Sequence, residues 1–220
     1  MFAGRLPADH WYFDPGQGGR LLGEVCHFID TAGFLVPGRP VGVRAVGVDA
    51  RDPAAAQSLT LQITYDDGSA ASIVYGGLTP PGAPKELLEV ATDRVAARID
   101  DFRSLTVWKG GREVTTKYRG GPKGHAAEMH SLVRLVRGEP LGEETAAAAD
   151  FASALWSSLV ACRAARSLTE DGVVGTAPAH RLWPGPWVCG PGPGAAGAVP
   201  KPGGQAAYPV GGSSSTTVAR

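Results

Sequence analysis

The feature that most constrains this chain is the Asp-Asp-Gly turn at 66–68, which separates two runs of alternating apolar residues. The runs SLTLQITY (58–65) and SAASIVYG (69–76) place apolar side chains at every second position, as half-buried strands do. Asp-Gly readily adopts the backbone conformations of a tight hairpin turn. The sequence therefore predicts a β-hairpin over 58–76.

Further strands are predicted on both sides of this hairpin. The segment VGVRAVGVDA (41–50) also alternates with period two. Four more short strand-like runs follow the TPPGAP loop and are separated by Asp, Gly or charged pairs; they lie at 85–92, 94–102, 103–110 and 112–120. Short strands joined by short turns indicate a largely antiparallel sheet.

Helical periodicity occurs at 23–36, at 124–138 and at 143–168, where strong helix formers are abundant. The first helix is expected to turn Val25, Phe28, Ile29 and Leu35 towards the core. In the second, Met129, Leu132, Val133 and Val136 fall at helical spacing. The sequence predicts an α+β fold, an open predominantly antiparallel sheet with helices on one face.

Composition divides the chain into two parts. Residues 176–220 are dominated by Gly, Pro, Ala and Ser, without a period that a core could use. We interpret residues 1–175 as one α/β-sheet domain and 176–220 as a largely disordered tail.

Charge and cysteine content exclude several classes of protein. The chain has 21 basic and 21 acidic residues and no basic block, so it lacks the footprint of a nucleic-acid-binding protein. Its apolar runs are shorter than the roughly 18–20 residues of a membrane helix, and its N-terminus does not resemble a signal peptide. Three widely spaced cysteines favour reduced thiols, so a cytoplasmic location is expected.

The stretch GEVCHFID (23–30) concentrates side chains that can do chemistry. Glu24 and His27 are three apart and share a helix face, so the carboxylate could orient the imidazole, which exchanges protons near neutral pH. A structural role is the alternative for this pair. Two ligands do not complete a zinc site, so no metal is predicted. Cys26 is interpreted as a small apolar residue.

Several segments, in this order, resemble the C-terminal domain of Gfo/Idh/MocA oxidoreductases. They are GGRLLGEVCHFIDTAGFLV, the hairpin around DDGS, KELLEVATDRVAARIDDFRSL, the KGHAAE helix start and the final Ala-rich helix, which together cover about residues 4–170. The sequences of these segments are similar to those of bacterial family members that carry GEVCHFID.

The resemblance implies a role for several residues. In this family an N-terminal Rossmann domain holds NAD(P), and the C-terminal domain contacts a sugar or polyol and often forms a subunit interface. His27 matches the family's catalytic histidine, and the family's aspartate falls on Gly23, so Glu24 is the nearest carboxylate. Residues flanking the matched helices are expected to border the substrate; they are Tyr12, Lys123 and His125, with His10 as a further candidate.

The nucleotide-binding part of such an enzyme has no counterpart in the sequence. The one literal GxGxxG match, GPGAAG at 192–197, lies in the Pro-rich segment without the strand and helix that a dinucleotide site requires. The family's Glu-Lys-Pro motif is absent as well. NAD or NADP is therefore implied by resemblance alone, and no cofactor-binding residue is predicted.

Two hypotheses follow from this sequence. In the first, the chain is the substrate-binding half of a sugar or polyol oxidoreductase whose Rossmann domain is separate or missing. In the second, it is a non-catalytic module for oligomerisation or carbohydrate binding, or a truncated gene fragment. A homo-oligomer is expected through the sheet, where Val95, Leu105, Val107 and Trp108 would be exposed.

Overall fold

A computed structural model describes most of the chain. The described residues are 1–7, 9–48, 56–80, 82–118, 124–141, 151–170, 172–176 and 217–219. Among them, no helix combines the length and the hydropathy that crossing a membrane would need.

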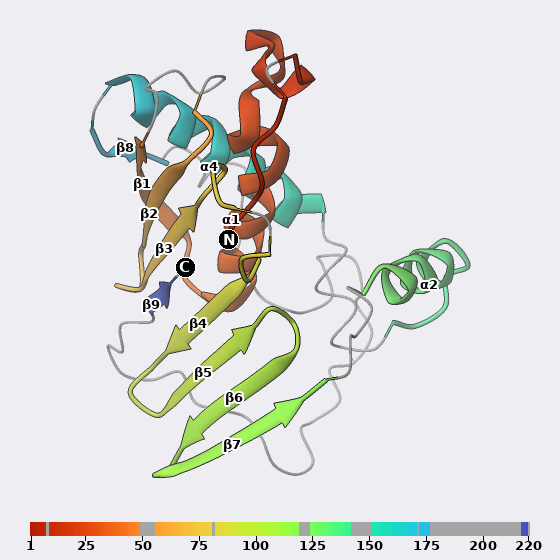
Figure 1. Cartoon of the computed structure of the whole chain (residues 1–220). Coiled ribbons are helices and arrows are strands. Elements are labelled where there is room, and N and C mark those ends of the chain that lie inside the picture. Colours follow the sequence, from red (N-terminus) through yellow and green to blue (C-terminus); the bar gives the residue numbers. More distant parts are fainter. Residues whose placement is uncertain are drawn as a thin grey trace.

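The chain begins with helical turns and continues as a run of strands (Figure 1). The opening elements are η1 (Trp11–Phe13), η2 (Pro15–Gln17), η3 (Leu21–Val25) and α1 (Cys26–Leu35). The strands are β1 (Pro40–Gly47), β2 (Leu59–Tyr65), β3 (Ala70–Tyr75), β4 (Leu87–Ala91), β5 (Val95–Asp100), β6 (Ser104–Lys109) and β7 (Arg112–Lys117). The remaining elements are α2 (His125–Val136), α4 (Phe151–Glu170), β8 (Val174–Gly175) and β9 (Thr217–Ala219).

The strands form one sheet in the order β7-β6-β5-β4-β9-β3-β2-β1-β8. Consecutive strands pair antiparallel from β1 to β3 and from β4 to β7, whereas β9 lies between β3 and β4 and is parallel to β3. The predicted hairpin is confirmed, with Leu61 opposite Ile73 and Gly68 at φ +85° in the turn. The predicted α+β fold with a predominantly antiparallel sheet is also confirmed.

The core lies between one face of β1–β3 and the helices α1 and α4 (Figure 1). Alternate residues of these strands are buried, as the period-two pattern predicts. Of the predicted helix face, Val25 and Ile29 are buried, and Phe28 and Leu35 pack against the core while partly exposed. The helices and the sheet are also linked by the Ala45 amide, which donates to Ser167 Oγ at 3.0 Å.

The helix α2 departs from the prediction that all helices cover the sheet. Its existence is confirmed, but no residue of α2 is buried, and its large apolar residues are 45–79 % exposed; they are Met129, Leu132, Val133, Leu135 and Val136. Helical spacing predicts an apolar stripe along one side of the helix. It does not identify the surface against which that stripe packs. The layer over the sheet therefore consists of α1 and α4.

The sheet half β4–β7 has two chemically different faces. Ile99, Leu105 and Val107 lie on one face, and Val114 on β7 pairs with Val107. Trp108 lies on the opposite face, where its indole N–H donates to Glu113. Trp108 and Val107 therefore lie on opposite faces of the sheet, because adjacent strand residues point to opposite faces, and the interface expected through the sheet stays a prediction.

The predicted boundary between domain and tail stays a prediction. Before it, β8 pairs with β1, and the buried Thr176 amide donates to the Val41 carbonyl at 3.0 Å. Residues 177–216 lie outside the described residues, and 217–219 form β9.

Candidate functional site

The candidate site begins at a π-helical turn, Leu21–Val25, that leads into α1. The Cys26 amide donates to the Leu21 carbonyl, five residues earlier, so the turn is wider than an α-helical one. Single π-helical turns inside helices occur frequently at functional sites, because the extra residue changes which side chains face a cleft. Glu24 belongs to this turn and His27 to the α-helix that follows.

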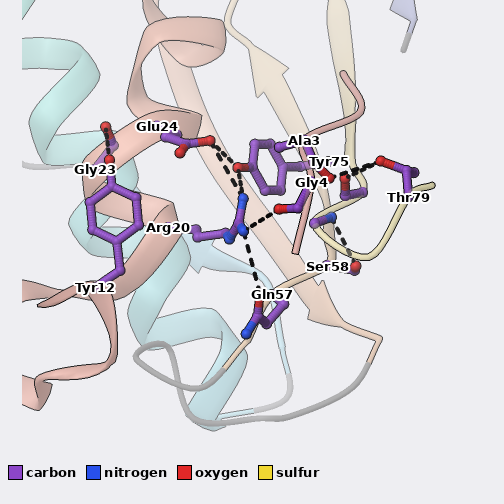
Figure 2. Close-up of polar contacts among 12 residues, drawn as sticks. Ala3, Gly4, Tyr12, Arg20, Gly23, Glu24, Gln57, Ser58, Tyr75 and Thr79 are labelled. Atoms are coloured by element: carbon purple, nitrogen blue, oxygen red, sulfur yellow. Dashed lines mark hydrogen bonds and ion pairs between the residues drawn. The ribbon is translucent and has the colours of Figure 1, made fainter. Parts of the chain in front are cut away.

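A buried arginine holds Glu24 in place (Figure 2). The Arg20 side chain is 1 % exposed, its Nη1 lies 3.7 Å from Glu24 Oε2, and Nη1 donates to Tyr75 Oη at 2.6 Å. Tyr75 in turn donates its hydroxyl hydrogen to Glu24 Oε2. Two groups, the Arg20 guanidinium and the Tyr75 hydroxyl, therefore fix one oxygen of the carboxylate.

The same guanidinium also anchors the N-terminal segment. Arg20 Nη2 donates to the Gly4 carbonyl at 2.6 Å and to Gln57 Oε1 at 3.4 Å (Figure 2). Its Nε is buried without a hydrogen-bond partner among the described residues. A buried cation is costly unless it is paired, so this set of contacts compensates for its desolvation.

Burial and the Glu24 carboxylate raise the pKa of Tyr75, with burial the larger cause and the Arg20 charge opposing them. Burial also raises the pKa of Tyr12, and Glu24 adds to that effect. Both hydroxyls therefore remain protonated donors well above neutral pH.

His27 does not pair with Glu24, contrary to the orienting role that the spacing suggested. Neither a hydrogen bond nor an ion pair joins the two side chains in the described part of the chain, because Tyr75 and Arg20 take the Glu24 carboxylate. The His27 side chain is exposed, and its backbone carbonyl accepts from Thr31 Oγ1 at 2.8 Å. The two residues share a groove without touching.

That groove brings together three of the residues predicted from the sequence. It is an open depression of about 580 Å³ between the N-terminal segment, α1 and the start of β4. Its polar lining contains the predicted Glu24, His27 and His125. The other charged residues of its lining are Arg5, Arg20, Lys85 and Glu86.

The other predicted substrate residues are placed differently. Tyr12 is buried and does not line the groove; its hydroxyl donates to the Gly23 carbonyl at 3.3 Å. His10 Nδ1 accepts from the Tyr12 amide at 3.2 Å, which caps η1. Lys123 lies outside the described residues.

Gly23, at the position of the family's aspartate, is closed to any side chain by Tyr12. A Cβ atom built at Gly23 would lie 2.5 Å from Tyr12 Cε1 and 2.7 Å from Cζ. The Tyr12 ring therefore occupies the space that an acidic side chain at 23 would need.

Sequence reasoning missed Arg20 and Tyr75. Arg20 carried a usable signal, since it precedes Glu24 by four residues and opposite charges at that spacing face each other on a helix. Tyr75 lies 51 residues from Glu24, on β3, and no local pattern connects them.

Two other residues of the GEVCHFID stretch have structural roles. Cys26 is partly buried, burial raises the pKa of its thiol, and Sγ contacts the Leu22 carbonyl at 3.0 Å. Asp30 accepts from Ser153 Oγ at 2.9 Å, which ties α1 to α4. The described residues contain no group of three or more His, Cys, Asp or Glu that could hold a metal ion.

Replacement of Gly23 tests the Tyr12 contact. We expect Gly23→Ala to lower the free energy of unfolding by about 1–3 kcal/mol, because the added methyl overlaps the Tyr12 ring. In a Tyr12→Ala background the same change should be neutral or stabilising, since alanine favours a helix over glycine. Denaturant unfolding of the four proteins measures the coupling, and equal effects in both backgrounds would contradict the contact.

Alkaline pH should destabilise the fold through its buried tyrosines. Burial raises the pKa of Tyr65 and of Tyr75, so in the unfolded chain both lose their protons first, near pH 10. Their contribution is full below about pH 10 and is lost as the pH rises towards the folded-state pKa values. Tyr65→Phe should make the fall in unfolding free energy shallower, as urea titrations at increasing pH can measure. The exposed Tyr118→Phe is the control, and an unchanged slope in Tyr65→Phe would refute this assignment.

Comparison with known proteins was made for both sequence and structure. Residues 1–97 match the model of the family described as GFO/IDH/MocA C-terminal domain. No curated protein matches the chain.

Solved structures with this fold are oxidoreductases. UDP-N-acetylglucosamine 3-dehydrogenase GnnA from Acidithiobacillus ferrooxidans is 19 % identical with a TM-score of 0.60, over 77 % of this chain and 51 % of that one. Levoglucosan dehydrogenase in complex with NADH and L-sorbose is 16 % identical with a TM-score of 0.62, over 80 % and 57 %. Aldose-aldose oxidoreductase from Caulobacter crescentus, complexed with glycerol, is 18 % identical with a TM-score of 0.60, over 79 % and 53 %.

The chain spans about half the length of these structures. At this level of identity the likeness establishes the fold, which agrees with the independent match of the first 97 residues. The chain thus has the α+β fold of the GFO/IDH/MocA C-terminal domain, and residues 1–97 match that family in sequence.

Proposed function

We propose that this chain is the substrate-binding, C-terminal part of an NAD(P)-dependent oxidoreductase of the Gfo/Idh/MocA family that acts on a sugar or polyol. The observation that carries the proposal is the groove in which Glu24, His27 and His125 meet, although they come from separate elements. The bound NADH and L-sorbose of levoglucosan dehydrogenase, which shares the fold, agree with this class of reaction.

In this proposal His27 exchanges the proton of the substrate hydroxyl. Its imidazole is exposed in the groove and is not engaged by Glu24, so it is available to a ligand. Imidazole is the side chain best suited to accept and return a proton near neutral pH.

Glu24 has a different role, which is to bind and orient the substrate. Its Oε2 accepts from Tyr75 and faces Arg20, whereas no described residue hydrogen-bonds to Oε1. A carboxylate oxygen with free lone pairs accepts hydrogen bonds from sugar hydroxyls well. Because Tyr75 and Arg20 fix the other oxygen, Oε1 offers a substrate a preset position.

We propose that the nicotinamide cofactor is held by a separate Rossmann domain, as the resemblance to the family implies. A dinucleotide-binding unit needs two parallel strands joined by a helix, and the strands β1–β7 pair antiparallel. The described residues contain no such unit, and the GPGAAG segment at 192–197 lies outside them. We therefore assign the cofactor to a Rossmann domain in a longer protein or on a separate chain.

A test begins with ligand binding to the full chain. In calorimetric titrations with a panel of monosaccharides and polyols, we expect His27→Ala to weaken binding about threefold to tenfold, the effect of one lost hydrogen bond between uncharged groups. His130→Ala on α2, an exposed histidine outside the groove, should bind as the original chain does. Equal affinity of His27→Ala would remove this residue from the site. Binding of NAD(H) or NADP(H) in the same titrations would overturn the assignment of the cofactor to another domain.

A second candidate function, a non-catalytic oligomerisation module, is favoured by a face of β5–β7 that no described helix covers (Figure 1). Leu105 and Val107 are only partly buried on that face, and Val114 is 61 % exposed. The opposite face is polar, with the Arg98–Glu89 ion pair and the Thr106–Thr115 hydrogen bond. Such an apolar face is suited to a symmetric contact between two copies.

Light scattering distinguishes the two faces. We expect a dimer that Val114→Asp converts into a monomer, because the substitution buries an unpaired carboxylate in the contact. Thr115→Asp, its neighbour on the polar face, should leave the dimer intact. A monomer for the unmodified chain would contradict an interface on this sheet.

A further inference from the structure

We propose that the groove selects a sugar or polyol that carries an anionic group, a carboxylate or a phosphate, and that Arg5 and Lys85 bind that group. The inference rests on the proposed function, because the same groove would hold the reacting part of the substrate beside Glu24 and His27. It adds a substrate class and two binding residues.

The first observation is the charge of the groove. Three permanently charged cations line it, Arg5, Arg20 and Lys85, against two carboxylates, Glu24 and Glu86. Arg20 is buried and bound to the Glu24 carboxylate, so these two charges compensate each other. The cations left for a ligand are Arg5 and Lys85.

The second observation is that both cations are exposed and carry no ion pair among the described residues. Some arginines elsewhere on the surface have carboxylate partners, such as Arg39 with Asp66 at 3.0 Å and Arg166 with Glu170 at 2.5 Å. With Arg20 compensated by Glu24, Arg5 and Lys85 outnumber the one remaining carboxylate of the groove, Glu86, and leave a net positive charge that attracts an anionic ligand.

The third observation is that the backbone beneath both cations is fixed. The Lys85 amide donates to Asp101 Oδ1 at 3.2 Å, and its carbonyl accepts from the Phe2 amide at 2.7 Å. Next to Arg5, the Gly4 carbonyl accepts from the buried Arg20. The hydrogen bond from Phe2 holds the N-terminal segment beside Lys85. The two cations therefore lie on neighbouring backbone segments that are both held by hydrogen bonds.

The position of the cations indicates how a substrate would lie. Gly4, Arg5 and Lys85 line this groove and also a shallower one of about 430 Å³ that continues towards Thr79 and Ala83. The cations therefore lie where the two grooves meet, whereas Glu24 and His27 belong only to the first. An anionic group between Arg5 and Lys85 would leave the hydroxyl-bearing part of the ligand facing Glu24 and His27.

The chemistry of the two side chains fits this role. A guanidinium can form two parallel hydrogen bonds with a carboxylate or phosphate, and an ammonium adds a compact charge with three donors. Because both groups are exposed, their attraction for the anion should be screened by salt.

Calorimetry with matched ligands tests the proposal on the full chain. The ligands are D-glucose, D-glucuronate and D-glucose 6-phosphate, with inorganic phosphate as the bare anion. At low salt we expect at least one anionic sugar to bind about tenfold more tightly than glucose. The ratio of the affinity for the anionic sugar to the affinity for glucose should fall about threefold to fivefold in Arg5→Gln and in Lys85→Gln. It should also fall in about 0.5 M NaCl. Arg112→Gln and Lys117→Gln on β7 are the controls and should leave it unchanged.

The outcomes separate this inference from the proposed function. Sugar binding that depends on His27 but shows no preference for the anion would overturn the inference and leave the proposed function standing. A preference that survives the Arg5→Gln/Lys85→Gln double variant would also overturn it. Phosphate binding that needs Lys85, with no binding of any sugar, would support the anion site and count against the sugar oxidoreductase. A difference between glucuronate and glucose 6-phosphate identifies which anion the groove prefers.

Discussion

The buried guanidinium of Arg20 is the interaction on which the candidate site depends. It links the π-helical turn to β3 through Tyr75, to the N-terminal segment through Gly4 and to the loop before β2 through Gln57. Loss of one partner of a buried charge typically costs about 3–5 kcal/mol, because the remaining charge is desolvated without compensation. The groove walls are therefore linked to one another through this one buried charge.

The sequence contained enough information for the fold because the strands obey a local rule. Alternation over 58–65 and 69–76 requires one buried face, and Asp66-Asp67-Gly68 sets the register that brings Leu61 opposite Ile73. The same reasoning places Trp108 and Val107 on opposite faces of the sheet, since neighbouring residues of a strand point apart. It could not tell that the α2 stripe stays exposed, since that depends on which partner surface lies within reach.

The site was predicted only in part, for a physical reason. Glu24 and His27 lie three residues apart, but helical spacing only brings side chains near each other and does not decide which acceptor each one takes. Tyr75 and Arg20 compete for the Glu24 carboxylate from inside the core, where a hydrogen bond is worth more than at the exposed position of His27. That competition involves β3, 51 residues away, so no local pattern contained it.

The contact between Gly23 and Tyr12 explains why the carboxylate of this candidate site belongs to residue 24 of the π-helical turn. The Tyr12 ring fills the space beside Gly23, so an acid at that position is sterically excluded. The π-helical turn instead presents the next residue, Glu24, and Arg20 four residues earlier on the same face supplies its counter-charge. Because Tyr75 and Arg20 both hold Oε2, Glu24 is a positioned hydrogen-bond acceptor more than a proton acceptor. In the function that we propose, the exposed imidazole of His27 carries the proton transfer, and Glu24 orients the substrate.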